Sequence, residues 1–315
     1  MPVIKVDDLS FGRLKAPDLD RMEEFLSDFG FYRVERTADK LFMRGTGPDH
    51  HIHVTELGAP ALVGWAYRVN DRDKLKVLAK HPGATGIEHL DEPGGGERVC
   101  VTEPNGYRIE VIHGQQRVAP IDLKRQAVNS VAEPTKRAGE LMRIPPGPAR
   151  PARMGHAVLG TPHINETVKW FRDVIGLVCS DDVYAGEKDH IIGSFNRLDC
   201  GDDYVDHHSF FCLRHERTGL NHFSYEVQDI DDVLMGHEWL RARNKYEHMW
   251  GIGRHVLGSQ VYDYWADPWG RTHEHWADSD RLNAGNSAAL HAAEDALRSQ
   301  WGQPITDKML DRICP

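Results

Sequence analysis

The chain has 315 residues, with 38 basic and 48 acidic side chains, so its net charge is −10 before any histidine is protonated. This balance disfavours nucleic-acid binding, because phosphate recognition needs a basic surface. The hydrophobic content of 40% and the charged content of 27% are ordinary for a globular protein. No apolar run of about 18 residues predicts a membrane span, and no secretory pattern opens the sequence, so we expect a soluble cytoplasmic protein.

Cysteine and histidine usage narrows the chemistry. The five cysteines form an odd set without CxxC spacing, which argues against a disulfide framework and against a zinc knuckle, and fits a reducing compartment. Histidine is unusually frequent, with 19 residues, many of them in the C-terminal half. This excess prompts a search for metal ligands.

An internal repeat organises the chain. Residues 9–31 and residues 154–177 each have the pattern of a strand, a turn with a proline, an amphipathic helix and a glycine after the helix. Gly30 and Gly176 suit the left-handed conformation that often ends a helix. The repeat predicts that one half of the chain is a copy of the other.

Each half continues with a second strand and helix, at residues 63–80 and 221–238, and ends in a hairpin whose turn contains Pro-x-Gly. Each half therefore contains two βαβββ-like modules, which predicts an α+β fold built by duplication. We expect a first domain at residues 1–114 and a second domain at residues 154–280.

Two segments lie outside the repeat. Residues 115–153 are rich in proline and arginine, so they are predicted to form an extended surface linker, with a short helix over 123–131. Residues 281–315 are predicted to be a helical segment. Its central part, residues 288–302, has helical composition and is expected to cover part of the second half.

Three residues of the second half are candidate metal ligands. His156 lies in the first predicted strand, His222 in the strand of the second module, and Glu274 in the last strand. Two imidazoles and one carboxylate from separate strands can occupy one face of an octahedral metal, which leaves adjacent positions open for a substrate and for O₂. We expect one metal per chain, because the first half lacks this set. Its matching residues are Phe11, Gly64 and Glu110.

The end of the second half resembles a known signature. The pattern runs from His255 through Tyr264 and an Asp-Pro-x-Gly turn to Glu274. It resembles the type I extradiol ring-cleaving dioxygenases of the vicinal oxygen chelate superfamily, whose members include catechol 2,3-dioxygenase. Asp263 departs from the pattern, which prefers an aliphatic residue there. The resemblance covers roughly residues 5–280.

The resemblance implies a function. It makes His156, His222 and Glu274 the ligands of Fe(II), with Mn(II) as the alternative metal. It implies the vicinal oxygen chelate fold, the cleavage of a catecholic ring by O₂ in the degradation of aromatic compounds, and a homo-oligomer, often a tetramer. The implied partners are therefore a small aromatic substrate and O₂, with no nucleic acid and no membrane.

The resemblance also assigns catalytic residues. His208 matches the acid–base histidine, while His255 and Tyr264 match a pair beside the substrate oxygens. An imidazole with an ordinary pKa of about 6.5 suits proton transfer in both directions.

His207 is the rival of His208. Neighbouring residues of a strand face opposite sides, so we expect only one of the two to face the site. The first half carries His50 and His51 at the matching place, so a packing role for such a histidine is the alternative interpretation.

Two substitutions concern the substrate. In the homoprotocatechuate branch of the family, an arginine that binds the substrate carboxylate stands at the position of Trp250, and a polar amide stands at the position of Val158. We therefore expect a catechol or trihydroxyarene with alkyl, aryl or hydroxyl substituents. Arg254 and Arg281 are the basic residues that would reverse this expectation. The tryptophans that either wall an apolar pocket or belong to the ordinary core are Trp250, Trp265, Trp269 and Trp276.

Two alternative functions follow from the same fold. One is another metalloenzyme, such as an isomerase or a thiol transferase, although these usually carry further acidic ligands. The other is a metal-free protein that sequesters a small molecule, although three ligands retained in one half argue against it. Metal content and oxygen uptake with catechols distinguish these classes.

Overall fold

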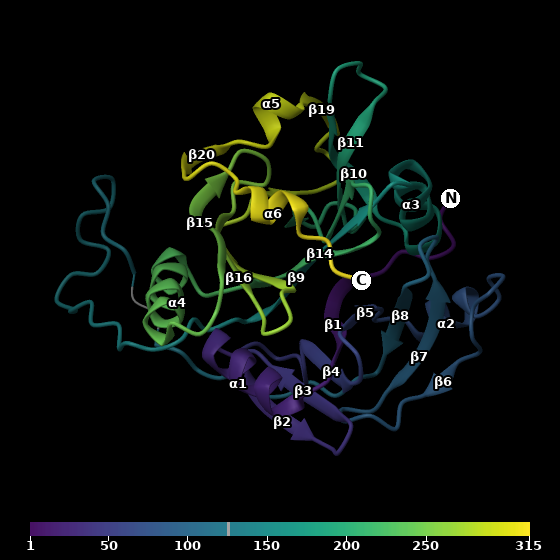
Figure 1. The fold of residues 1–315 in the computed structure, drawn as a ribbon, viewed down its shortest axis with the longest axis horizontal. Helices are drawn as coiled ribbons and strands as arrows, with labels where there is room; N and C mark the ends of the chain where they lie inside the picture. The colour runs from purple at the N-terminus through teal and green to yellow at the C-terminus, as the bar shows by residue number, and fades with distance from the viewer. Residues whose placement is uncertain (125–126) are drawn as a thin grey trace.

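The computed structural model describes residues 1–124 and 127–315 and contains two large β-sheets that follow each other along the chain. Figure 1 shows the first sheet in the lower, purple-to-blue half and the second in the upper, green half. The strands of the first sheet are ordered β2-β3-β4-β1-β5-β8-β7-β6. The elements of this half are β1 (Asp8–Ala16), α1 (Leu19–Phe29), β2 (Tyr32–Arg36), β3 (Lys40–Arg44), β4 (His53–Leu57), β5 (Ala61–Arg68), α2 (Arg72–Leu78), β6 (Glu88–His89), β7 (Glu97–Thr102) and β8 (Arg108–His113).

The second half repeats this arrangement and adds a C-terminal extension. Its repeated elements are β9 (Arg153–Thr161), α3 (Ile164–Trp170), the π-helical turn η1 (Phe171–Ile175), β10 (Val178–Tyr184), β11 (Ile191–Arg197), β12 (Val205–Asp206), β13 (Phe210–Arg214), β14 (Gly219–Glu226), α4 (Ile230–Arg243), β15 (His248–His255), β16 (Val261–Ala266) and β17 (Thr272–Ala277). The extension contains β18 (Arg281–Leu282), β19 (Ala289–Ala292), α5 (Ala293–Ala296), β20 (Ser299–Gly302) and α6 (Asp307–Asp311). The large sheet has the order β19-β10-β11-β13-β9-β14-β17-β16-β15-β20.

The strand register confirms the duplication. In the first half, β1 pairs antiparallel with β5 so that Arg13 faces Gly64. In the second half, β9 pairs with β14 so that Val158 faces His222. In the first half, β8 runs parallel to β5, and Glu110 of β8 lies beside Ala66. In the second half, β17 runs parallel to β14, and Glu274 of β17 lies beside Ser224. The fold is thus two sheets, each made of two βαβββ modules, as the repeat predicted.

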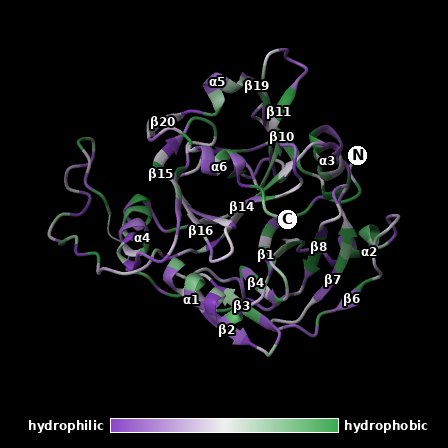
Figure 2. Ribbon diagram, viewed as in Figure 1, coloured by the Kyte–Doolittle hydropathy of each residue, from purple (hydrophilic) through white to green (hydrophobic). Residues whose placement is uncertain are grey.

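Helix α1 forms where the sequence predicts it. The Asp18 carboxylate accepts hydrogen bonds from the backbone N–H groups of Asp20 and Arg21, and Gly30 ends the helix with φ at 110°. The helix carries both hydrophobic and hydrophilic residues (Figure 2), and its apolar side chains contribute about 1.5–3 kcal/mol each by burial. The buried residues are Leu19, Met22, Phe25, Leu26 and Phe29.

The C-terminal segment differs from the prediction. The prediction of one helix over 288–302 was wrong, because this stretch contains β19, the four-residue helix α5 and β20. Strand β19 pairs with β10, and β20 pairs with β15, so the two strands extend both edges of the second sheet. Backbone pairing with exposed sheet edges therefore overrode a helical composition. Figure 1 shows these yellow elements and α6 gathered beside the green strands of the second sheet.

The predicted linker is an extended arm on one side of the molecule (Figure 1). In its described part before β9, it contains no helix or strand except a single bridge between Arg117 and Asp49. The short helix expected over 123–131 is absent from residues 123–124 and 127–131, and residues 125–126 lie outside the described part of the chain. The limits of the domains stay a prediction.

Buried polar contacts join the two halves. The Nδ1 atom of His53 lies 2.8 Å from the hydroxyl of Tyr225. The Nε2 atom of His275 donates to the carbonyl of Phe29 at 2.8 Å. All four residues are buried, so these hydrogen bonds fix how the halves are oriented.

In the first half, an arginine lies where the second half has its candidate ligands. The Nε atom of Arg13 donates to Oε1 of Glu110 at 2.8 Å, and its Nη2 atom donates to Glu92 at 2.7 Å. Arg13 and Glu110 are 0% and 1% exposed. A fixed guanidinium therefore neutralises the carboxylate that matches Glu274.

We predict that Arg13→Leu lowers the free energy of unfolding by about 3 kcal/mol, because it removes the main partner of buried carboxylates. Arg98 and Arg108 also contact Glu110, which limits the loss. Urea denaturation measures the change. The control is Arg33→Leu, since Arg33 forms an exposed ion pair and should cost less than about 1 kcal/mol. Equal losses in the two variants would contradict this account.

Candidate metal centre

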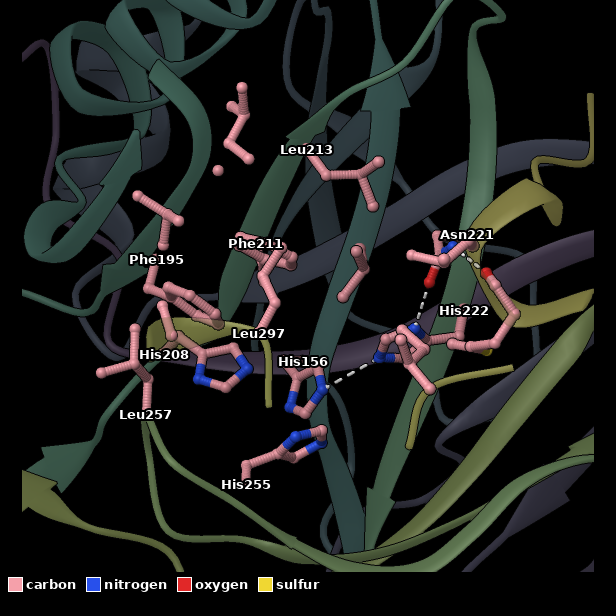
Figure 3. Close-up of a pocket in the computed structure, with 18 of the residues that line it drawn as sticks. His156, Phe195, His208, Phe211, Leu213, Asn221, His222, His255, Leu257 and Leu297 are labelled. Atoms are coloured by element: carbon pink, nitrogen blue, oxygen red, sulfur yellow. Dashed lines mark hydrogen bonds between the residues drawn. The ribbon is translucent and has the colours of Figure 1, made fainter. Parts of the chain in front are cut away.

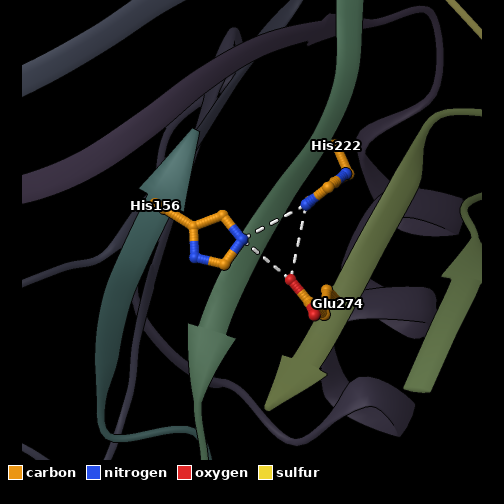
Figure 4. A group of neighbouring side chains, drawn as sticks. All are labelled: His156, His222 and Glu274. Carbon is orange, nitrogen blue, oxygen red and sulfur yellow. Dashed lines mark hydrogen bonds and ion pairs between the residues drawn. The ribbon is translucent and has the colours of Figure 1, made fainter. Parts of the chain in front are cut away.

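Three adjacent strands of the second half bring His156, His222 and Glu274 together, and Figure 4 shows the three side chains converging on one point. The Nε2 atom of His156 lies 2.9 Å from Oε2 of Glu274 and 3.2 Å from Nε2 of His222. The Nε2 atom of His222 lies 3.4 Å from the same carboxylate oxygen. The three residues are 2%, 6% and 0% exposed.

This donor set fits a metal ion. Two ligand atoms about 2.1 Å from a metal and at right angles to each other lie about 3.0 Å apart, close to the observed spacing. Burial would raise the pKa of Glu274, but His156, followed by His222 and His255, holds it well below its usual range. The carboxylate is therefore ionised, and burial lowers the pKa of His156 so that its ring is neutral. A neutral imidazole and a carboxylate are the forms that bind metals.

Neighbouring residues fix the orientation of the second ligand. The Nδ1–H of His222 donates to Oδ1 of Asn221 at 2.6 Å, which leaves the Nε2 lone pair for a metal. The amide nitrogen of Asn221 donates to the carbonyls of Met309 and Arg312 at 3.4 and 3.1 Å. The C-terminal extension therefore holds the residue that orients His222. This contact joins residues about 90 positions apart, so the sequence pattern does not predict it.

His156 and His222 line one end of a cavity of about 360 Å³, and the Glu274 carboxylate lies against both of them. Figure 3 shows His156, His208, His222 and His255 grouped at one end of it, with Phe211 and Leu213 further along. Most of the remaining lining is apolar. Representative residues are Val158, Phe195, Trp250, Leu297 and Met309.

His208 lines the cavity, and His207 does not. The ring centroid of His208 lies 4.2 Å from that of His156. His207 turns away, and its Nε2 atom donates to Oδ2 of Asp181 at 2.7 Å. The Nδ1 atoms of the two neighbouring histidines lie 3.1 Å apart. The order Asp181, His207, His208 is therefore a hydrogen-bonded chain that ends at the cavity.

The prediction that His208 has an ordinary imidazole pKa was wrong. Burial is the main cause that lowers its pKa well below 6.5, and His156 and His207 lower it further. The ring is therefore neutral at neutral pH. The matching pair His50 and His51 in the first half has the same 3.1 Å Nδ1 spacing.

His255 and Tyr264 form a second pair beside the ligands. The Nε2 atom of His255 lies 2.9 Å from the Tyr264 hydroxyl and 3.8 Å from Oε1 of Glu274. Burial is the main cause that lowers the pKa of His255 and raises the pKa of Tyr264 well above 10. Both polar groups are thus neutral, and both residues line the cavity.

Trp250 and Val158 both line the cavity, as the substrate expectation requires. The ring of Trp250 is stacked against that of Tyr264 at 5.5 Å, and its indole N–H donates to the carbonyl of Gln303 at 2.9 Å. The other tryptophans considered from the sequence do not line the cavity. These are Trp265, Trp269 and Trp276.

Arg254 and Arg281, the two arginines that could have reached the substrate, do not line the cavity. Arg254 forms an ion pair with Asp278, and Arg281 forms one with Asp206. Arg214 lines the cavity, and its Nε and Nη1 atoms donate to the carbonyls of Ile191 and Pro162. It is the only arginine of the cavity lining in the described part of the chain.

Known proteins resemble this chain. Residues 153–274 match the family model of the Glyoxalase/Bleomycin resistance protein/Dioxygenase superfamily. Metapyrocatechase 2 of Cupriavidus necator is 28% identical over 298 residues, which cover 93% of this chain and 88% of that protein. The manganese-dependent 2,3-dihydroxybiphenyl 1,2-dioxygenase of Geobacillus genomosp. 3 is 25% identical over 269 residues, which cover 81% and 79%. The Mn(II)-bound glyoxalase from Novosphingobium aromaticivorans superposes with a TM-score of 0.78 at 22% identity, over 96% and 94% of the chains.

The fold and the ligand set define a metalloprotein with a two-histidine, one-carboxylate centre inside a sheet made of two βαβββ modules. The second half, residues 153–274, matches the family model of the glyoxalase, bleomycin resistance protein and dioxygenase superfamily, and most of the chain is similar in sequence to two dioxygenases. In the described residues, no helix is both long enough and apolar enough to cross a membrane.

We predict that His222→Gln lowers the iron bound per chain at least tenfold after reconstitution, because it removes one of three ligands. Glu110→Gln should leave the iron content unchanged, since the matching carboxylate of the first half is bound by Arg13. Elemental analysis of both proteins measures the difference. Iron lost from Glu110→Gln while the protein stays folded would show that the first half also holds a metal.

Proposed function

We propose that the chain is an extradiol dioxygenase that cleaves a catecholic ring with O₂ and places both oxygen atoms in the product. The observation that carries the proposal is one buried ligand triad whose two histidines line a largely apolar cavity, with His208, His255 and Tyr264 in the same lining. The two dioxygenases similar in sequence over most of the chain support it.

Fe(II) is the proposed metal, with Mn(II) as the alternative. His156, His222 and Glu274 would hold it, and the three donors leave adjacent positions open. Bound there, the metal supplies Lewis acidity to a catechol and a route for electrons between the catechol and O₂. The similar dihydroxybiphenyl dioxygenase is named as manganese-dependent, so reconstitution with each metal decides between them.

His208 is the proposed acid–base residue. His207 donates to Asp181, so the Nδ1 atom of a neutral His207 can accept from the Nδ1–H of His208. This tautomer leaves the Nε2 atom of His208 free to accept the proton of a substrate hydroxyl. The same atom can return the proton to an oxygen atom as the ring opens. His207 then acts as a positioning residue.

His255 and Tyr264 are proposed to bind a substrate oxygen. Their polar atoms lie 2.9 Å apart, close to Glu274, and both groups are neutral. Tyr264 can donate a hydrogen bond to a catecholate oxygen while His255 fixes the direction of the hydroxyl. Both side chains therefore favour an ionised substrate without adding a net charge to the cavity.

A catechol with alkyl, aryl or further hydroxyl substituents fits the rest of the cavity. Trp250 and Val158 are the proposed substrate-binding residues, and both offer apolar surface near the ligands. A ring of this class buries its substituent against carbon atoms and meets no ionic partner there.

The superposed chain is named as a glyoxalase and shares this fold, and a fold alone does not decide the reaction. The glyoxalase alternative lacks support from the site, because the described cavity lining contains the His255 and Tyr264 pair and no acidic residue. Oxygen consumption with a panel of catechols tests the proposal. No uptake by the iron-loaded or manganese-loaded protein with any of them would overturn it.

We further place the protein in the cytoplasm as a homo-oligomer. All five cysteines are unpaired, as fits a reducing compartment. The linker exposes apolar side chains that a second copy can cover, among them Val128 and Val131. Sedimentation velocity measures the oligomeric state.

We predict that His208→Phe lowers kcat by a factor on the order of 10² or more, because acid–base catalysis typically contributes about 10²–10⁴. Iron content should stay unchanged, since His208 is not a ligand. His207→Phe should cost less, because His207 lies outside the cavity and acts only through the ring of His208. A larger loss in His207→Phe than in His208→Phe would contradict the assignment.

We also predict that kcat/KM for alkyl-substituted catechols exceeds that for protocatechuate or homoprotocatechuate by at least about tenfold, or about 1.4 kcal/mol. An unpaired carboxylate loses hydration in this lining, whereas each buried CH₂ gains about 0.8 kcal/mol. Initial rates of oxygen uptake measure the ratio. Equal turnover of the carboxylated catechols would mean that an arginine reaches the ring.

A further inference from the structure

A second group of metal-binding side chains lies outside the catalytic cavity. His237 of α4, His248 of β15 and Asp263 of β16 each offer one ligand atom, and these atoms lie within 4.8 Å of one another. The Nε2 atom of His248 is 2.7 Å from Oδ1 of Asp263, and the Nδ1 atom of His237 is 3.1 Å from the same oxygen. We call these three residues the outer cluster.

The outer cluster lies on the opposite face of the sheet from the cavity. In the register of β16 and β17, Tyr264 pairs with Glu274 on the cavity side, and Asp263 pairs with His275. Successive side chains of a strand point to opposite faces, so Asp263 and His275 face outward, toward α4. The aspartate that departs from the family signature is therefore the residue that builds this cluster.

Asp263 is held in a ligand-like orientation. Its Oδ2 atom accepts from the indole N–H of Trp265 at 2.5 Å, and its Oδ1 atom points at both histidines. The residue is 0% exposed, whereas the side chains of His237 and His248 are 18% and 32% exposed. One oxygen is therefore oriented by a supporting hydrogen bond, and the other meets two imidazoles that a cation can reach from solvent.

A further nitrogen lone pair lies on this face. The Nε2–H of His275 donates to the carbonyl of Phe29 at 2.8 Å. Its Nδ1 atom is buried without a hydrogen-bond partner in the described residues. A Cβ atom on Gly236, next to His237, would lie 3.3 Å from it. The face thus concentrates nitrogen and oxygen donors under α4.

We propose that the outer cluster is a second metal site, which binds a borderline divalent cation of the zinc class through His237, His248 and Asp263. Two imidazoles, one carboxylate and an open position for water form a common zinc site. Zinc ligands about 2.0–2.1 Å from the metal lie about 3.3 Å apart, so the 2.7 and 3.1 Å contacts of Asp263 Oδ1 would lengthen by about 0.6 and 0.2 Å on binding.

A cation at this site would be a second metal, in addition to the one metal per chain expected from the sequence. A cation there would join α4 to β15 and β16, and these two strands carry His255 and Tyr264 into the cavity. It would therefore hold the two strands in register without touching the substrate. The proposal does not depend on the reaction at the inner site.

The test starts from iron-loaded protein, which is desalted and titrated with Zn²⁺ in the absence of O₂. We expect one zinc per chain in addition to the iron, measured by isothermal titration and elemental analysis, and a higher Tm. His237→Gln and His248→Gln should each weaken zinc binding at least about tenfold and keep the iron. Both histidines are partly exposed, so these variants avoid the folding risk of changing Asp263.

Two matched variants complete the test. His190→Gln changes an exposed histidine outside both sites and should keep both metals. His222→Gln should lose iron and keep zinc, which separates the outer cluster from the inner site. Two results would overturn the proposal: zinc binding that is unaffected by His237→Gln and His248→Gln, or no zinc bound outside the iron site. In either case, His237 and His248 would serve only as hydrogen-bond partners of Asp263.

Discussion

A buried carboxylate must be matched by positive charge or by hydrogen-bond donors, and this constraint shapes both halves of the molecule. Glu274 faces two imidazoles whose lone pairs suit a metal. Glu110, at the same place in the first half, faces the guanidinium of Arg13 instead. Asp263 faces two histidines and an indole. The two halves therefore share one acidic position, Glu110 in the first and Glu274 in the second, but different groups neutralise it. Of these two carboxylates, only Glu274 remains free to bind a cation.

The features that depend on local sequence could be predicted. The helix stops at Gly30 and Gly176 follow from left-handed glycines, and the structure has φ at 110° and 83° there. The ligand triad followed from comparing the halves, since His156 of β9 occupies the position that Phe11 has in β1, the matching strand of the first half. The resemblance of the segment from His255 to Glu274 then supplied the reaction. Each of these inferences rests on residues close in sequence or on the internal repeat.

Features that depend on distant contacts could not be predicted in the same way. Residues 288–302 have a helical composition, but unpaired edges of the second sheet offered their backbone a better partner. Asn221 and the chain from Asp181 to His208 support the site through contacts between segments far apart in sequence. In the sequence, Asp263 is only a departure from the dioxygenase signature. The structure shows that it contacts His237 and His248. No periodicity records such contacts, because each one depends on tertiary packing.

The anchoring of Asn221 has a consequence for the order of events during synthesis. The carbonyls of Met309 and Arg312 hold the amide that orients His222, and Leu220 exchanges two backbone hydrogen bonds with Cys314. Residues 309–314 leave the ribosome after all three ligands. His222 is therefore held in its orientation only after the chain has been made as far as Cys314 and this segment has packed against β14.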